Sequence, residues 1–382
     1  MDLVVDSARE SWRAELREWL AANVPAEPLP SLDTAEGFAA HRDWERRMYD
    51  GGFAVVTWPE RFGGRGVDLL DWLTFEEEYW AARAPVRVSQ NGIFLLAPTM
   101  WEFATDAQLD RFMLRMARAD DIWAQGWSEP GAGSDLAALR SRADRDDDRG
   151  GWRLNGQKTW STRGAFADWM FGLFRSDPDS SRHHGLTYLL VPLDAEGVTV
   201  RPIRQLDGEP GFAEVFFDDV FVPDDQVLGA VGQGWSVAMS TTTSERGLTL
   251  RSPGRFMAAA DRLLDLARQT PDASTRVVDD AVDAWLDADA YRLYVLDTAL
   301  RALDGQRIGA ESSANKLFWS DLDVRIHDAA LRLLGPTATL TDGADASWLD
   351  GYLFSLAGPI YAGTNEIQRN VLAERVLGLP RG

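Results

Sequence analysis

The chain has 382 residues, 45% of them hydrophobic, which suffices for two or three domains with well-buried cores and excludes a disordered chain. Its formal net charge of -21 disfavours binding of nucleic acid or anionic lipid, because both are bound by Lys and Arg side chains that neutralise phosphates. It contains no cysteine, so disulfides, thiolate metal sites and thiol nucleophiles are excluded.

The amino-terminal stretch MDLVVDSARESW has no basic segment followed by an apolar one, so it does not resemble a secretory signal. No run approaches the roughly 18 apolar residues that a membrane helix needs. We therefore expect a cytoplasmic protein that does not insert into a membrane. Only Lys158 and Lys316 are lysines among 39 basic residues, a bias that we attribute to coding composition.

The N-terminal part of the chain carries helical patterns. The first covers residues 7–22, where Ser7 and Glu10 have the spacing of a capping box and apolar residues recur on one face. A second pattern ends at Asp50-Gly51-Gly52, and others follow in LLDWLTFEEEYW and AQLDRFMLRMA. We predict an N-terminal helical domain over residues 1–121.

Residues 122–228 have the composition of β-strands. The segments TYLLV, VTVRPI and AEVFFDDVFV are rich in β-branched and aromatic residues and are separated by Gly and Pro. Within GWRLNGQKTW, the dipeptide Asn155-Gly156 is of the type that two-residue hairpins favour, which predicts a turn there. We predict a small β domain over this range.

Helical periodicity returns from Gly234 onward. Apolar residues fall near one stripe in two segments, Val278, Val282, Trp285, Leu286, Leu293 and Leu296 in the first and Leu317, Val324, Leu331 and Leu334 in the second. We predict a helical bundle over residues 229–382.

The segment WSEPGAGSD, residues 127–135, is one candidate for ligand binding. Its small residues let backbone amides approach a ligand closely, and Ser128 and Ser134 add hydroxyls suited to a carbonyl edge or a phosphate. The alternative is a simple turn. Because no G-x-G-x-x-G precedes a βαβ unit, we do not expect a Rossmann nucleotide site.

The segment NGQKTWST, residues 155–162, is the second candidate. The indole of Trp160 could pack on a flat heteroaromatic ring while a hydroxyl of Ser161 or Thr162 serves a ring nitrogen. The alternative is a core tryptophan beside two surface hydroxyls.

These two segments and several others occur in an order that resembles the acyl-CoA dehydrogenase family over nearly the entire chain. The other matching motifs are WPERFGGRG at 58–66, FFDDVFVP at 216–223, GQGWSVAM at 232–239 and the final IYAGTNEIQRNVLAERVLG. The resemblance implies a mainly α fold with a central β domain, in which an N-terminal helical domain and a small β-barrel domain precede a C-terminal four-helix bundle.

The resemblance also implies FAD as cofactor and the removal of hydrogens from the α and β carbons of an acyl-CoA thioester to give a 2-enoyl-CoA. In the family a carboxylate takes the α proton, the β hydrogen leaves as hydride to flavin N5, and an electron-transferring flavoprotein accepts the electrons. Carried onto this chain, Trp160 packs beside the isoalloxazine and Thr162 hydrogen-bonds near N5. Trp127 and Ser128 meet the pyrimidine edge, and Ser134 lies near the pyrophosphate or the pantetheine arm of the substrate.

Two further cofactor contacts, Thr364 and Glu366, fall in the last loop. Arg268 takes the position of an arginine that contacts the FAD of a neighbouring subunit, which implies a homotetramer or a heterotetramer with a paralogous subunit. The R-x-x-F-G segment of the family is absent, and RLLGPTA, residues 332–338, replaces its Gln and paired glycines. An alternative function is therefore a non-catalytic or half-site subunit, and another is a biosynthetic flavin oxidation on the same fold.

The catalytic base departs from the commonest family pattern. Many members carry Glu immediately before the Gly-Thr of the last loop, where this chain has Ala362, whose side chain cannot accept a proton. Members similar to isovaleryl-CoA dehydrogenase take the base from an earlier helix, and there TTTSERGLTL offers Glu245. A carboxylate needs only hydrogen-bond reach to the α carbon, so we predict Glu245 as the base; the alternative is a solvated residue paired with Arg246.

The same comparison assigns two supporting roles. The backbone N–H of Ala362 holds the thioester carbonyl, which requires no side chain, and Arg246 orients or packs against the substrate. The small side chain at 362 removes bulk beside the α carbon, so we expect a branched or ring-bearing acyl group. The four histidines of the chain, His41, His183, His184 and His327, form no metal-binding pattern.

Overall fold

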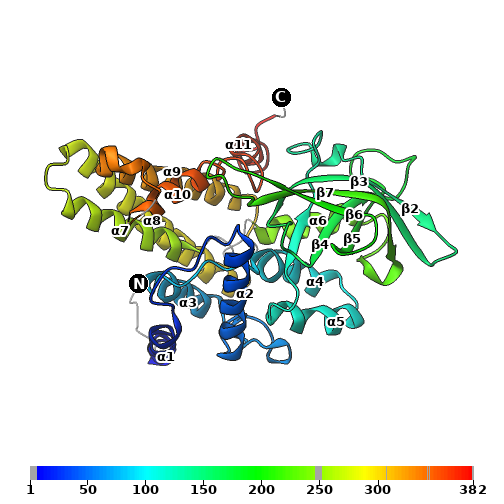
Figure 1. Cartoon of the computed structure of the whole chain (residues 1–382), viewed down its shortest axis with the longest axis horizontal. Coiled ribbons are helices and arrows are strands. Elements are labelled where there is room, and N and C mark those ends of the chain that lie inside the picture. The colour runs from blue at the N-terminus through cyan, green and yellow to red at the C-terminus, as the bar shows by residue number, and fades with distance from the viewer. Residues whose placement is uncertain (1–6, 246–251, 307, 342, 344, 381–382) are drawn as a thin grey trace. The chain divides into compact units, whose positions relative to one another are not determined.

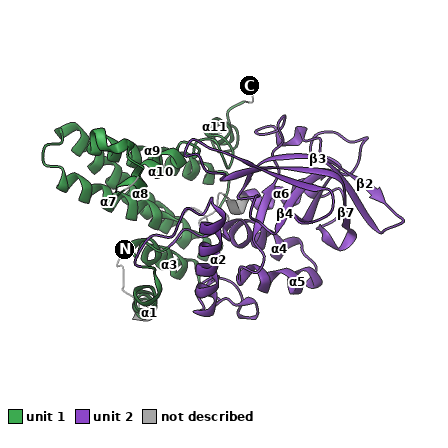
Figure 2. Cartoon of the chain, viewed as in Figure 1, with its two compact units in different colours: residues 1–25, 67–84, 246–382 green, residues 26–66, 85–245 purple. Residues whose placement is uncertain are grey.

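The computed structural model describes residues 7–245, 252–306, 308–341, 343 and 345–380, and at residues 7, 8 and 243–245 it describes the backbone alone. Contacts within the chain divide it into two compact units (Figure 2). Unit 1 comprises Met1–Pro25, Val67–Ala84 and Arg246–Gly382, and unit 2 comprises Ala26–Gly66 and Pro85–Glu245. The domain limits at residues 121 and 228 remain a prediction.

Unit 1 is helical (Figure 1). Its helices are α1 (Ser7–Asn23), α3 (Leu69–Ala81), α7 (Pro253–Gln269), α8 (Thr275–Leu303), α9 (Ser312–Leu334), α10 (Ala346–Ser355) and α11 (Asn365–Val371), with single turns at Gly335–Thr339 and Leu372–Val376. Helices α7, α8 and α9 pack against one another, and α3 packs on α7. The predicted helix over residues 7–22 is confirmed, although the side chain of Ser7, the first residue of its capping box, lies outside the described side chains.

The apolar stripe predicted for α8 is not its buried face. Val282, Leu286 and Leu293 are 42%, 54% and 51% exposed. The face that packs inside unit 1 is instead made mostly of small residues, Ala281, Ala284, Ala288, Tyr291, Val295, Thr298 and Ala299. On α9, the predicted residues are likewise only half-buried. Helical periodicity predicts an apolar face but does not predict whether another element covers it. Close packing of these helices favours small side chains such as alanine on the buried face.

Unit 2 combines helices with a sheet. The helices are α2 (Ala35–Asp50), α4 (Ala97–Phe103), α5 (Asp106–Ala117) and α6 (Gly234–Glu245), with short turns at Glu60–Phe62, Leu136–Ala138 and Asp224–Gln226 and a π-helical turn, η2 (Asn91–Leu96), before α4. Helix α2 starts at Thr34, whose side chain accepts a bond from the N–H of Gly37, and Thr105 and Gln108 form a capping box for α5. Among the described residues, none of the helices is long and apolar enough to cross a membrane.

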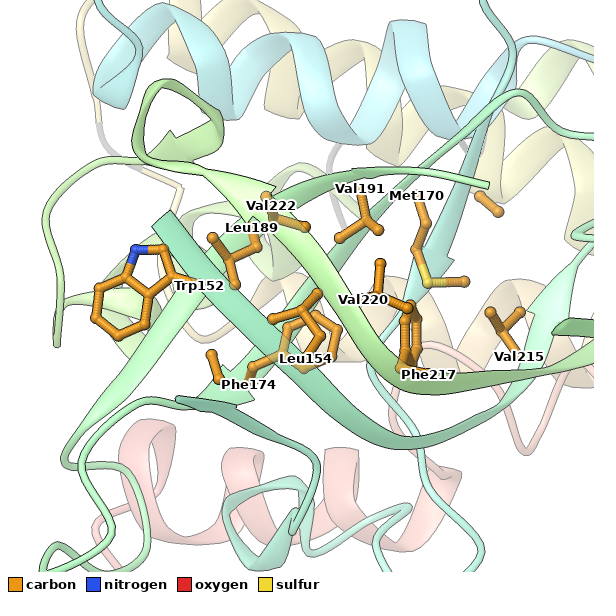
Figure 3. Close-up of a cluster of buried hydrophobic side chains, with 12 residues drawn as sticks. Trp152, Leu154, Met170, Phe174, Leu189, Val191, Val215, Phe217, Val220 and Val222 are labelled. Carbon is orange, nitrogen blue, oxygen red and sulfur yellow. The ribbon is translucent and has the colours of Figure 1, made fainter. Parts of the chain in front are cut away.

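The sheet of unit 2 has eight strands and is mixed. They are β1 (Trp123–Gly126), β2 (Arg142–Asp146), β3 (Gly151–Thr162), β4 (Trp169–Arg175), β5 (Leu186–Pro192), β6 (Val198–Ile203), β7 (Phe212–Pro223) and β8 (Val227–Leu228). The order is β6-β7-β3-β2-β4-β5-β8, with β1 parallel to β4. Side chains of β3, β4, β5 and β7 meet in a core that includes Trp152, Leu154, Met170, Phe174, Leu189, Val191, Val215, Phe217, Val220 and Val222 (Figure 3). This core fixes β3 and the residues at its end.

The hairpin turn predicted at Asn155-Gly156 is wrong. Both residues lie inside β3, where its pairing with β7 shifts between Leu154 and Gly156 as in a β-bulge. Gly156 has φ 144°, and a Cβ there would lie 2.4 Å from Oγ of Ser141. Gly156 therefore allows the backbone of β3 to lie close to Ser141. The turn that joins β2 to β3 ends instead at Gly150, whose φ is 67°.

Candidate active site

Loop 127–135 lies directly beside β3 in unit 2. The N–H of Thr159 donates to the carbonyl oxygen of Ser128 at 2.9 Å, and Glu129 and Ala132 bond each other through their backbones at 3.0 Å. The indole of Trp127 is buried, and within the described part of the chain its Nε1 has no hydrogen-bond partner. The structure thus brings Trp127 and Ser128 next to the strand that carries the predicted flavin contacts.

The far part of this loop is open. Around Gly131 and Gly133, nothing lies within 4 Å of the position that a Cβ would occupy, and Ser134 is exposed. Backbone amides and the Ser134 hydroxyl are therefore accessible to a ligand.

A buried ion pair fastens the loop to β3. Nζ of Lys158, which is 0% exposed, lies 2.7 Å from Oε1 of Glu129. Glu129 also accepts bonds from the N–H groups of Arg140 at 2.6 Å and Ser141 at 2.9 Å. Burial lowers the pKa of Lys158 to about 8, against the opposing effect of Glu129. Burial acts to raise the pKa of Glu129, but Lys158 and the two backbone donors lower it below its usual value, so the pair is charged at neutral pH.

Trp160 is 59% exposed, so the alternative of a core tryptophan is wrong. Its φ is 60°, in the left-handed region, at the point where the register between β3 and β7 shifts between Lys158 and Ser161. The edge of its ring meets Phe212 with the centroids 5.9 Å apart. A bulky residue in this conformation is uncommon, and an exposed indole on the strand that also carries Thr162 fits a flat heteroaromatic ligand.

The predicted base lies at the end of α6. Glu245 is the last residue of that helix, and its side chain is outside the described side chains; Arg246 lies outside the described residues altogether. Val237, Ala238 and Thr241 form the buried face of α6. Glu245 follows Thr241 by one helical turn.

The last loop belongs to unit 1, and two of its residues have left-handed backbones, a conformation that is strained only at Ala362. Ala362 has φ 56° and Gly363 has φ 79°. Nε2 of Gln368 donates to the carbonyl oxygens of Ala362 at 3.0 Å and Gly363 at 3.2 Å, which turns both carbonyls toward α11. In the described residues, the N–H of Ala362 has no acceptor. It can therefore donate to a ligand.

Thr364 and Glu366 follow in the same turn. Oγ1 of Thr364 caps α11 by accepting from the N–H of Ile367 at 3.3 Å. Glu366 is exposed, and its own backbone N–H together with Thr364 lowers the pKa of its carboxyl. Arg268 is also exposed, at the end of α7, where it pairs with Asp265 at 2.6 Å.

A second buried lysine fastens this loop. Nζ of Lys316, which is 1% exposed, donates to Oδ1 of Asn365 at 2.7 Å, and Oγ of Ser320 donates to the same oxygen at 3.1 Å. The N–H of Asn365 donates to the carbonyl oxygen of Pro359 at 2.8 Å, which closes the loop. Sequence reasoning missed both lysines as site residues. The signal was present, because they are the only lysines of an arginine-rich chain.

Within the described residues, no group of three His, Asp or Glu side chains could hold a metal ion.

Comparison with known proteins identifies the family of the chain. Models of the N-terminal, middle and C-terminal domains of acyl-CoA dehydrogenases match residues 6–120, 124–220 and 232–377. The acyl-CoA dehydrogenase IpdE1 of Mycobacterium tuberculosis is 41% identical over 383 residues, which cover 97% of this chain and 98% of IpdE1. The chain belongs to the acyl-CoA dehydrogenase family, and it is a flavoprotein oxidoreductase with FAD as cofactor.

Two other relatives are similar over most of this chain. The acyl-CoA dehydrogenase FadE34 of M. tuberculosis is 37% identical over 362 residues, which cover 92% of this chain and 48% of FadE34. The crystal structure of the ChsE4-ChsE5 complex from M. tuberculosis matches with a TM-score of 0.86 and 29% identity, and the match covers 100% of both chains.

Proposed function

We propose that this chain carries out FAD-dependent α,β-dehydrogenation of an acyl-CoA thioester to the 2-enoyl-CoA, with Glu245 as the base. The observation that best supports this proposal comes from Ala362 in the last loop. The N–H of Ala362 has no acceptor in the described residues, whereas its methyl group cannot take a proton. Position 362 can hold a carbonyl but cannot remove the α proton, so the proposal assigns the proton to a carboxylate at another position.

Each residue has a separate task in this reaction. The N–H of Ala362 donates to the thioester oxygen and stabilises the negative charge that grows on it when the α proton leaves. Glu245 takes that proton as the general base. Arg246 orients the substrate.

The proposed contacts of the cofactor are as follows. Its ring would lie against Trp160 and Thr162, with Trp127 and Ser128 at its edge. Ser134, Thr364 and Glu366 would meet its polar parts, and Arg268 would serve the FAD of the neighbouring subunit. When bound, FAD supplies the acceptor for the β hydride.

The acyl group is branched or bulky in this proposal, because a methyl group at Ala362 leaves more space beside the α carbon than a glutamate does. A panel of butyryl-, octanoyl-, isobutyryl-, isovaleryl- and cyclohexanecarbonyl-CoA, assayed by bleaching of the flavin, tests this point. A difference of one methylene in an apolar pocket changes kcat/KM by roughly 10–200-fold. If a straight-chain thioester is preferred by about tenfold or more, the link between Ala362 and substrate shape is wrong.

The partner in this proposal is a paralogous subunit that forms a heterotetramer with this chain, and a homotetramer is the competing arrangement. The exposed stripe of Val282, Leu286 and Leu293 on α8 is apolar surface that a second subunit would cover. A net charge of -21 opposes self-association and favours a less acidic partner. The match to this chain covers only 48% of FadE34. ChsE4 and ChsE5 form a complex of two proteins.

Purification of the chain alone and together with a paralogue tests the partner. A yellow heterotetramer that acyl-CoA bleaches, beside a chain that is colourless alone, supports the proposal. A yellow homotetramer that acyl-CoA bleaches would show that no paralogue is needed. A chain that stays inactive while its partner's own base is essential would instead indicate the half-site subunit. We further propose an electron-transferring flavoprotein as acceptor and the cytoplasm as location.

A further inference from the structure

Two threonine hydroxyls meet between α4 and α6. Oγ1 of Thr99 lies 2.8 Å from Oγ1 of Thr241, and both residues are 0% exposed. Each hydroxyl also reaches the carbonyl oxygen four residues earlier in its own helix, Leu95 at 2.9 Å and Val237 at 3.1 Å. A hydroxyl has one proton, so one threonine donates to its own helix while the other donates across the gap. The two helices are therefore joined by a buried hydrogen bond.

A second bond joins the same helices at their exposed edge. Oγ of Ser240 donates to Oε2 of Glu102 at 2.5 Å. Ser240 precedes Thr241 on α6, and Glu102 lies nearly one turn after Thr99 on α4. Because adjacent residues of α6 point in directions about 100° apart, bonds to both resist rotation of the helix about its axis.

Rotation of α6 matters because Glu245 is its last residue. A side-chain group about 6 Å from the helix axis moves by roughly 1 Å when the helix turns by about 10°. A displacement of about 1 Å at a reacting group can reduce a rate about 10²-fold.

The network also reaches the loop that carries Trp127. Oη of Tyr188, a buried residue of β5, lies 3.4 Å from Oγ1 of Thr241. The ring of Tyr188 stands edge-on to Trp127 at 6.4 Å between centroids and parallel to Phe171 at 6.0 Å. Thr241 thus connects the helix that ends at Glu245 with one of the proposed flavin contacts, inside one unit.

We propose that Thr241, through its bond to Thr99, is a positioning residue that holds Glu245 in register with the flavin loop; this inference rests on the proposed role of Glu245 as base. Its function is to set where the carboxylate meets the α carbon. The hydroxyl takes no part in proton transfer.

Thr241→Val tests the inference in the FAD-loaded protein, assembled with its paralogous subunit if the chain alone does not retain FAD. Thr99 keeps its bond to Leu95, so the variant removes the link between the helices together with the 3.4 Å contact to Oη of Tyr188. We expect FAD to be retained and the rate of flavin reduction by the best thioester of the panel to fall by about 10–10²-fold. The pH of half-maximal reduction should shift, because Glu245 would meet altered surroundings. Thr241→Ser should restore most of the rate.

A matched control is Thr298→Val on α8, where another buried hydroxyl donates to the carbonyl oxygen four residues earlier, at 2.8 Å from Tyr294. If Thr241→Val loses stability as Thr298→Val does but keeps the wild-type rate and pH profile, the inference is overturned. Should Thr241→Val fail to fold, Thr99→Val decides by the same criteria. Glu245→Gln distinguishes failure of the proposed base from failure of the positioning role. If Glu245→Gln reduces the flavin at the wild-type rate, Glu245 is not the base. If Glu245→Gln is slow but Thr241→Val is unaffected, only the positioning role of Thr241 is wrong.

Discussion

The ammonium group of Lys158 lies 2.7 Å from Oε1 of Glu129, and this contact joins the middle of β3 to the loop that carries Trp127 and Ser128. Both partners are buried, and the same carboxylate holds the N–H groups of Arg140 and Ser141. One carboxylate therefore closes the loop and sets its distance from the strand that carries Trp160.

Glu129→Gln should destabilise the fold strongly, because it leaves a buried ammonium without its counter-charge. Breaking a buried pair in this way costs about 3–5 kcal/mol of unfolding free energy. Adding Lys158→Met should recover much of the loss, since the uncompensated charge is then gone. Urea unfolding measures both. As a control, Asp144→Asn, in the exposed pair with Arg142, should change stability by less than about 1 kcal/mol. A Glu129→Gln variant as mild as this control would contradict the prediction.

The pair also predicts a dependence of stability on alkaline pH. Burial lowers the pKa of Lys158 from 10.5 to about 8, so between these values the folded chain has released a proton that the unfolded chain still binds. The unfolded state binds more protons in this window, so this group makes the unfolding free energy rise with pH. Relative to Lys158→Met, the wild-type chain should gain up to about 1.4 kcal/mol per pH unit. Urea unfolding of both proteins from about pH 7 to pH 10 checks the slope, and a flat or falling difference would refute it.

Glu245→Gln should keep the fold and FAD but slow flavin reduction at least about 10²–10⁴-fold, the usual contribution of a general base. Ala362→Glu in the same background should return part of the activity, because it places a carboxylate in the last loop. Stopped-flow bleaching of the flavin by the preferred thioester gives both rates. Near-wild-type reduction in Glu245→Gln would assign the base to another residue.

Replacing Trp160 should separate cofactor binding from stability. Trp160→Ala should weaken FAD binding by about 2–12-fold, because an aromatic contact contributes about 0.5–1.5 kcal/mol. Trp160→Gly should bind FAD as weakly as Trp160→Ala. Its unfolding free energy should be about 1–2 kcal/mol higher than that of Trp160→Ala, since only glycine adopts φ 60° without strain. FAD titration and thermal unfolding of the apoprotein are the two measurements. Equal stabilities of the two variants would mean that the backbone relaxes.

The fold could be predicted because its signals are spread along the chain. Helical periodicity located α1 to α3 and the bundle, and motifs in a fixed order identified the family. Which side of a helix is buried could not be read in the same way. Val282 and Leu286 on α8 repeat at helical spacing yet lie on the exposed side, because spacing describes one helix and burial depends on its neighbours.

The sequence predicted which residues belong to the candidate site but not their backbone conformations. The resemblance directed attention to Trp160 and Ala362, but nothing in either residue type predicts a left-handed backbone, which both normally avoid. Asn155-Gly156 is a residue pair that suggested the wrong structure. This dipeptide is typical of turns, yet it lies in a strand, where Ser141 occupies the space that a side chain at Gly156 would need. The sequence shows that Lys158 and Lys316 are unusual, because they are the only lysines, but it does not show their role. Their burial, with side chains bonded to the two loops, indicates that they hold these loops in place.

Because Lys158 and Lys316 are the only lysines of the chain and both are buried, neither ε-amine meets a reagent in water while its loop is closed. A protease that cuts only after lysine would cleave the chain at two places, one in β3 and one in α9. The rates of those two cleavages under native conditions would report how often each loop opens, and added FAD should slow both. The two lysines would then report cofactor loading without a mutation or a substrate.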